Sequence, residues 1–166
     1  MALNIEDKKL VVEEVTAVVA DSGSMITAEY RGLTVEQMTE LRAKARAANV
    51  QVRVVKNTLA RRAVAGTKFE DMADTFKGPL VFAWSGEELG NAARVFKDFA
   101  KDNDALIVNS LSIGEGVMDA SQLATIAALP TYDEAVAKLL FVIKEPVAKL
   151  ARALAAVKEQ KEAEAA

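Results

Sequence analysis

The spacing of apolar residues switches repeatedly between a helical and a strand-like period over the first 113 residues. Apolar side chains recur at helical spacing in four segments, which predicts helices over residues 4–21, 34–49, 57–66 and 87–101. Between these segments apolar and polar residues alternate, which predicts strands over residues 25–30, 50–56, 80–84 and 105–113. We therefore expect an α/β fold, with a small mixed sheet of about four strands covered by helices and with parallel pairing.

The last third of the chain contains helical spacing only. A short helix is predicted over residues 121–129, and Thr131 and Glu134 form a capping box for a helix through Lys144. Pro146 is predicted to interrupt that helix and to restart another. We expect an extended C-terminal helical spine, and three parts in all: an α/β domain at 1–130, a connecting helix at 131–145 and a partner-docking helix at 146–166.

The terminal helix carries an apolar stripe. On a helical wheel, one face gathers the candidate docking residues Val147, Leu150, Ala151, Leu154 and Val157. The stripe can pack on the core of its own domain, or it can be exposed and covered by another chain. The sequence leaves both interpretations open. A weak internal repeat, Val136-Ala-Lys-Leu-Leu and Val147-Ala-Lys-Leu-Ala, is of a kind that Ala- and Lys-rich helices produce easily.

The composition argues against an enzyme. The chain has neither cysteine nor histidine, which excludes disulfides, thiolate or imidazole metal sites, Ser-His-Asp triads and Cys-His pairs. The turns at Gly114-Glu-Gly and Ser22-Gly-Ser lack a Walker lysine, and Asp102 and Asp104 fall in a polar loop where a general acid would not be tuned. We expect no catalytic residue, cofactor or metal.

Charge is distributed unevenly. The chain has a net charge of -3, but residues 31–68 hold nine basic residues against two acidic ones, so this block carries +7 and the rest -10. No apolar run is long enough to span a membrane and the N-terminus lacks a signal-peptide pattern, so a cytoplasmic protein without membrane contact is expected.

The basic block is a candidate nucleic-acid surface. Its cations are spread over strand ends and two helices, and we expect them to lack acidic partners. Lys56 also precedes a predicted helix start, at Asn57 or Thr58, where free N–H groups suit a phosphate. Few aromatic residues are interleaved, which favours contact with the backbone of folded RNA over base stacking. The alternative is a solvated charged face.

Six motifs in order resemble one family. They are Tyr30-Arg-Gly-Leu-Thr-Val, Met38-Thr-Glu-Leu-Arg, Val54-Val-Lys-Asn-Thr-Leu-Ala-Arg-Arg-Ala, Lys77-Gly-Pro, Leu129-Pro-Thr-Tyr-Asp-Glu-Ala and a terminal Lys-Leu-Ala-Arg-Ala-Leu-Ala-Ala-Val-Lys helix. The ordered set resembles the bacterial large-subunit ribosomal stalk-base proteins, the tenth large-subunit protein and anchor of the acidic stalk. The resemblance covers essentially the whole chain.

The resemblance implies a structural constituent of the large ribosomal subunit. The α/β domain is then expected to bind large-subunit rRNA beside a neighbouring stalk-base ribosomal protein. The terminal helix is expected to anchor dimers of the acidic stalk protein, which recruit translational GTPases, and its short length suggests two dimers. The family's dimer-binding stripe falls on Val147, Leu150, Leu154 and Val157. The RNA-binding residues expected from it are Arg31, Lys56, Asn57, Arg61 and Arg62, with Arg42, Arg46 and Arg53 as weaker candidates.

A different class of function remains as the alternative. The chain could be a helical interaction module that dimerises through its terminal helix and does not bind RNA. That alternative predicts self-association that depends on concentration, and no salt-sensitive binding of RNA.

Overall fold

The computed structural model describes residues 4–86, 88–114 and 116–164. Backbone contacts divide the chain into an N-terminal unit, Met1–Leu129, and a C-terminal unit, Pro130–Ala166. The expected helix start at Glu87, the middle residue of the turn at Glu115 and the last two residues of the expected spine lie outside the described residues.

A five-stranded sheet forms the centre of the N-terminal unit, in the order β2-β3-β1-β4-β5. Each of its four pairings is antiparallel. The strands are β1 Ser24–Glu29, β2 Val50–Val54, β3 Leu80–Ser85, β4 Ile107–Ser112 and the short β5 Met118–Asp119. The α/β fold class is therefore confirmed.

The expected parallel pairing is wrong, and the strand order explains why. β1 and β2 run in the same direction, as a helical crossover between them requires, but β3 lies between them and pairs with both in the opposite direction. In the same way β1 lies between β3 and β4. This is the split β-α-β arrangement, in which the alternation of strands and helices sets strand direction but does not reveal which strands are neighbours.

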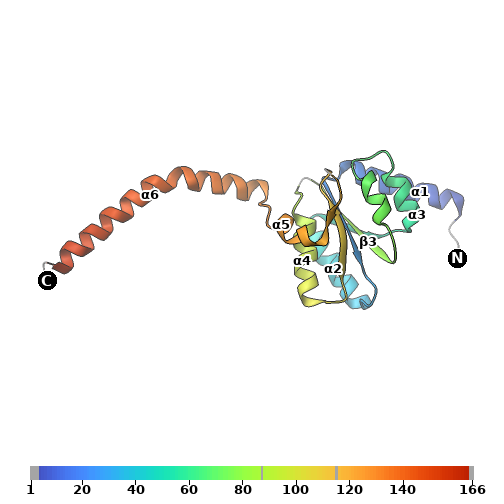
Figure 1. The fold of residues 1–166 in the computed structure, drawn as a ribbon, viewed down its shortest axis with the longest axis horizontal. Helices are drawn as coiled ribbons and strands as arrows, with labels where there is room; N and C mark the ends of the chain where they lie inside the picture. The colour runs from blue at the N-terminus through green and yellow to red at the C-terminus, as the bar shows by residue number, and fades with distance from the viewer. Residues whose placement is uncertain (1–3, 87, 115, 165–166) are drawn as a thin grey trace. The chain divides into compact units, whose positions relative to one another are not determined.

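Helices cover both faces of the sheet (Figure 1). One face packs Leu80, Phe82 and Trp84 against α1 Ile5–Asp21, α3 Asn57–Val64 and the 3-10 helix η1 Glu70–Thr75. The other face packs Val81 and Ala83 against α2 Val35–Ala47, α4 Asn91–Asp102 and α5 Leu123–Ala127. Successive β3 residues thus face opposite cores, because side chains alternate along a strand.

Capping boxes begin three helices, and the one predicted at Thr131 and Glu134 is among them. Reciprocal capping boxes join Asn4 with Asp7 and Thr34 with Gln37, and Thr131 and Glu134 exchange the same pair of hydrogen bonds. The helix expected over residues 121–129 is shorter: a 3-10 turn, η2 Ala120–Gln122, leads into α5.

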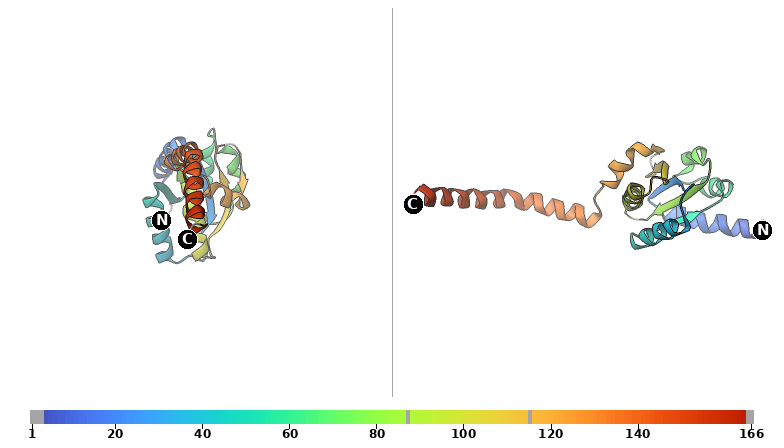
Figure 2. Two further views of the ribbon diagram at one scale, coloured as in Figure 1. Left: turned by 90° about the vertical axis from the view of Figure 1, so that its left-hand side faces the viewer. Right: turned by 90° about the horizontal axis from the view of Figure 1, so that it is seen from below.

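The C-terminal unit contains one helix where two were expected. Figures 1 and 2 show α6 Tyr132–Glu164 as unbroken, and Pro146 lies inside it. Proline removes one N–H donor and crowds the preceding turn, but its fixed φ is compatible with a helix. Strong helix formers on both sides of Pro146 continue the helix through it. Nothing in the structure tests the functional division at residues 131–145 and 146–166, which stays a prediction.

Candidate functional site

Three loops bring cations to one end of the sheet. Because β1 and β2 run opposite to β3, Glu29 and Val54, the last residues of β1 and β2, pair with Leu80 and Val81 at the start of β3. The residues just beyond these strand ends include Arg31, Lys56 and Lys77, which are all exposed. The Tyr30 N–H donates to the Pro79 carbonyl at 3.4 Å and ties the first loop to the third. We call the group Arg31, Lys56, Asn57, Arg61 and Lys77 the sheet-end surface.

Asn57 and Arg61 hold one of these loops in place. The Asn57 amide donates to the carbonyls of Gly78 at 2.9 Å and Phe76 at 3.4 Å. The Arg61 guanidinium donates to the carbonyls of Ala73 at 3.0 Å and Phe76 at 2.8 Å. A guanidinium has five N–H donors, so Arg61 can make these bonds and still contact a phosphate. Both predicted RNA-binding residues therefore position the loop that carries Lys77.

Gly78 is required at the turn of that loop. Its φ of +85° lies in the left-handed region that favours glycine, and a Cβ there would come within 3.1 Å of the Glu29 carboxylate. The turn of this loop therefore depends on the ability of glycine to adopt a positive φ.

The start of α3 also faces this end of the sheet. The N-cap residue is Lys56, not Asn57 or Thr58 as expected, because the Asn57 side chain turns away to bond the Gly78 carbonyl. No side chain caps the helix and its first turn carries no acidic residue. The positive end of the helix dipole and its first N–H groups therefore follow directly after the exposed Lys56, and this combination of charges suits a phosphate.

Arg62 lies apart from the sheet-end surface. It lines a groove of about 520 Å³ between α1 and α3, together with Lys8, Lys9, the acidic Glu13 and the apolar Ile5, Val12 and Leu59. Lys8 and Lys9 lie outside the +7 block, and sequence reasoning missed them because the acidic residues of α1 mask them in a running charge count. Their position beside Arg62 depends on the packing of α1 on α3.

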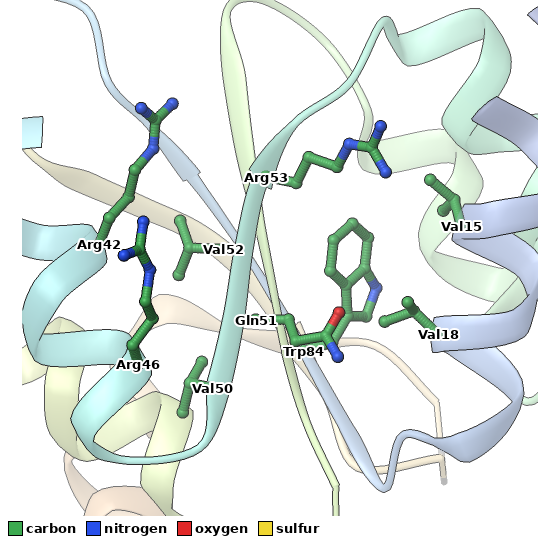
Figure 3. Close-up of a pocket in the computed structure, with 9 residues that line it drawn as sticks. All are labelled: Val15, Val18, Arg42, Arg46, Val50, Gln51, Val52, Arg53 and Trp84. Carbon is green, nitrogen blue, oxygen red and sulfur yellow. The ribbon is translucent and has the colours of Figure 1, made fainter. Parts of the chain in front are cut away.

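Arg42, Arg46 and Arg53 form a third group. Figure 3 shows them around β2, with Arg42 and Arg46 on the side of α2 and Arg53 on the side of α1. We call the hollow that they line the β2 groove; it has a volume of about 280 Å³. The predicted RNA-binding residues are thus distributed over three places and do not form one patch.

The expectation that the basic block lacks acidic partners is wrong at two positions. Arg53 pairs with Glu14 at 2.7 Å, and Lys44 pairs with Glu40 at 2.8 Å. Glu14 comes from α1, so only the tertiary structure places it near Arg53. The hydrogen bond that Lys44 donates to the Glu40 carboxylate raises the pKa of this lysine.

The α6 helix presents a longer apolar stripe than the predicted one. The predicted residues Val147, Leu150 and Leu154 are 65–71% exposed, Val157 is 50% exposed, and Ala151 is also exposed. Exposed apolar residues continue towards the start of the helix at spacings of three and four residues. We call the whole set the α6 stripe: Val136, Leu140, Ile143, Val147, Leu150, Ala151, Leu154 and Val157.

Sequence reasoning missed the first half of the stripe, although a signal was present. The run Leu139-Leu-Phe-Val-Ile is apolar on every side of the helix, and each of these residues is 60–67% exposed. A helix that is apolar all round is normally buried. Treating Pro146 as a break separated this run from the residues that follow it.

Neither surface resembles a catalytic centre. Among the described residues, no group of three or more carboxylates is placed to hold a metal ion. Asp98 is exposed, and a hydrogen bond from Lys101 lowers the pKa of its carboxyl group. No helix in the described part of the chain is long and apolar enough to cross a membrane. The exposed cations and the exposed apolar stripe define a binding protein with surfaces on two separate units.

Comparison with known proteins identifies the family. The model of "Ribosomal protein L10" matches residues 3–101, and that of "Ribosomal protein uL10 C-terminal region" matches residues 129–165. The large ribosomal subunit protein uL10 of Hydrogenovibrio crunogenus is 81% identical over 166 residues, covering 100% of both chains. The Marinomonas sp. protein of the same name is 52% identical over 166 residues, again covering 100% of both chains. The chain belongs to the ribosomal protein L10 family, a family of structural proteins and not of enzymes.

Proposed function

We propose that this chain, a structural constituent of the large ribosomal subunit, binds large-subunit rRNA at the stalk base and anchors dimers of the acidic stalk protein. The observation that carries the proposal is the α6 stripe, a long exposed apolar surface on a unit of its own. The N-terminal unit binds rRNA beside a neighbouring stalk-base protein. The anchored dimers recruit translational GTPases, which this chain reaches only indirectly.

The sheet-end surface supports contact with RNA phosphates. Arg31 can fork onto a phosphate through two N–H groups, and Lys56 acts as a point charge beside the helix N-terminus. Trp84 is 3% exposed, so it offers no stacking platform for a base. Recognition is therefore directed at the backbone and shape of folded RNA. Arg62, with Lys8 and Lys9, adds a second basic contact, while Arg42, Arg46 and Arg53 are weaker candidates for RNA.

The α6 stripe supports the docking of partner helices. Apart from Ala151, its members lie seven residues apart in two interleaved series, the spacing by which one helix packs along others. Burying each aliphatic side chain contributes roughly 1.5–3 kcal/mol before ordering costs, so several of them suffice for a stable complex.

Two features of α6 favour an acidic partner present in two copies. Residues 135–158 contain five basic residues and one acidic residue, so this segment is positively charged. Val136-Ala-Lys-Leu-Leu and Val147-Ala-Lys-Leu-Ala begin eleven residues apart, which is close to three helical turns and places both on one face. Two similar sites in succession accommodate two dimers. The same positive charge opposes pairing of α6 with a second copy of this chain.

The proposal is tested by measuring how the full-length chain binds rRNA and how it binds the acidic stalk protein. Arg31→Ala with Lys56→Ala removes two cations without touching Asn57 or Arg61, which hold the loop. Filter binding of a stalk-base rRNA transcript should weaken, and the slope of log affinity against log salt should fall by about 1.5–2. Lys144→Ala with Lys149→Ala on α6 removes the same charge and should leave the slope unchanged. Equal slopes for wild type and the first variant would contradict the RNA part.

The second half of the test concerns the stalk protein. Leu150→Asp with Leu154→Asp should abolish copurification of the acidic partner while rRNA binding stays intact, because two charges then interrupt the α6 stripe. Ala148→Asp with Ala156→Asp places the same two charges away from the stripe and should retain the partner. Retention of the partner by the first variant would refute anchoring by α6. Self-association of the purified chain in light scattering, without an acidic partner, would favour the self-dimerising alternative.

A further inference from the structure

The β2 groove lies along an edge of the sheet. β2 is the outermost strand next to β3, so alternate backbone N–H and C=O groups of residues 50–54 point away from the sheet. Val50 and Val52 line the groove on the side of α2, and Val15 and Val18 of α1 line it on the other side (Figure 3). A second hollow of about 240 Å³, which shares Val18 and Trp84, lies next to it. There is thus room for a chain segment along β2.

Trp84, which lines this space, carries a buried donor without an acceptor. The Trp84 side chain is 3% exposed, and its indole Nε1 has no hydrogen-bond partner among the described residues. Figure 3 shows the indole nitrogen on the side of α1, directed towards Val15 and Val18. An unsatisfied buried N–H costs about 1–3 kcal/mol. An incoming oxygen acceptor that reaches it would remove that cost.

Basic residues lie on both sides of β2, although Glu14 pairs with Arg53 and Asp21 lines the adjoining hollow. Arg42 and Arg46 lie one turn apart on α2, and neither has a hydrogen bond or ion pair within the described ranges. Arg53 faces α1, where its pair with Glu14 is about half exposed and therefore weak. An acidic side chain can compete for Arg53 at small cost.

We infer that the β2 edge binds an extended acidic peptide segment of a partner protein as an additional strand. Its backbone pairs with the free edge of β2, and its side chains alternate between the two sides. Carboxylates on one side reach Arg42 and Arg46. On the other side a carboxylate or amide oxygen accepts from Trp84 Nε1 and approaches Arg53.

The groove fits a peptide better than RNA or a second copy of this chain. RNA phosphates would bind the arginines, but they would neither pair with the backbone groups of the strand edge nor cover the valines that line the groove. A second copy would bring its own Arg42, Arg46 and Arg53 to the same edge, and like charges repel. An acidic strand pairs with the backbone of the edge, binds the arginines through its carboxylates and offers an acceptor to the indole N–H.

The test uses the full-length chain and a fluorescein-labelled ten-residue peptide in which glutamate and valine alternate. Fluorescence anisotropy of the peptide measures its binding. Arg42→Ala with Arg46→Ala should weaken binding about tenfold or more, because charge-assisted hydrogen bonds are lost. Trp84→Phe keeps an aromatic, though smaller, side chain but removes the donor, and should weaken binding about three- to tenfold. Arg31→Ala with Lys56→Ala removes the same charge from the sheet-end surface and should leave peptide binding unchanged.

N-methylated peptides separate strand pairing from attraction between charges. Two further peptides carry N-methyl groups on the odd-numbered or on the even-numbered amides. Each keeps every charge but cannot donate hydrogen bonds along one of its two edges. The peptide methylated on the edge that pairs with β2 should lose binding. Equal binding by both methylated peptides, or no saturable binding of the parent peptide, would overturn the inference. If Arg42→Ala with Arg46→Ala instead weakens rRNA binding and spares the peptide, the groove is an RNA surface. Because rRNA binding is measured separately, a negative result with the peptide does not contradict the proposed function at the stalk base.

Discussion

At the scale of single residues, several polar side chains of the candidate site are occupied within the fold. Asn57 and Arg61 bond the carbonyls of the loop that carries Lys77, and Arg53 pairs with Glu14. Below the same loop, the Ser110 hydroxyl lies 2.7 Å from that of Thr27 and 2.9 Å from that of Thr75, which joins η1 to the sheet. The loop geometry therefore depends on hydrogen bonds between residues far apart in sequence.

Asn57→Ala should destabilise the N-terminal unit by about 1–2 kcal/mol, since the Gly78 carbonyl loses its 2.9 Å donor and the longer contact to Phe76 is also lost. The free energy of unfolding from urea titration measures this change. Thr58→Ala, at the exposed neighbouring position, is the matched control and should change stability by about 0.5 kcal/mol or less. An equal loss in both variants would show that the Asn57 contacts do not hold the loop.

At the scale of elements, α6 differs most from the sequence-based expectation. Pro146 is inside the helix, so the amide hydrogen bond that it would otherwise donate to the Val142 carbonyl is missing. The α6 stripe passes this point without a change of face, because Ile143 and Val147 are one turn apart. Pro146 is therefore a weak point in the helix between two halves of one surface.

Pro146→Ala should increase the helicity of α6, because alanine restores the missing hydrogen bond and is about 3 kcal/mol more favourable than proline in a helix interior. Far-UV circular dichroism of the full-length chain should show a stronger helical signal and a higher melting temperature for that signal. Ala148→Gly, two residues away, should act in the opposite direction by about 1 kcal/mol. Unchanged helicity in Pro146→Ala would contradict the prediction and would show that Pro146 is not a weak point of α6.

At the scale of the whole molecule, the two units differ in how they are stabilised. The N-terminal unit has large aromatic residues buried on one face of its sheet, whereas the apolar residues of α6 are exposed. An isolated helix depends on its local propensity and is marginal in water. Partner binding should therefore stabilise α6 far more than it stabilises the sheet.

Hydrogen exchange of the full-length chain should show this difference directly. Amides of β1 and β3 should be the most protected, since both strands are paired on two sides, while α6 exchanges rapidly. Addition of the acidic stalk protein should slow exchange over residues 136–157 and leave β1 and β3 unchanged. Protection of α6 without a partner, equal to that of β3, would contradict this division.

Part of the candidate site could be predicted from local patterns. The capping boxes, the basic block and the stripe at Val147, Leu150 and Leu154 each depend on residues a few positions apart, which the sequence displays directly. Lys77 was missed as a contact residue because its loop meets those of Arg31 and Lys56 only in the folded sheet. Lys8 and Lys9 were missed because the acidic residues of α1 mask them in a running charge count, and only the packing of α1 on α3 places them beside Arg62.

The sequence by itself determined where most helices and strands form and where charge and apolar surface concentrate, although β5, η1 and the continuity of α6 through Pro146 were not predicted. These properties arise from side-chain periodicity, capping and propensity, which act within one or two turns. Only the tertiary structure decided the antiparallel strand order, the meeting of three loops at the sheet end and the pairing of Arg53 with Glu14. These depend on which elements pack together, and the packing energy of a sheet or core belongs to distant residues jointly rather than to any local segment.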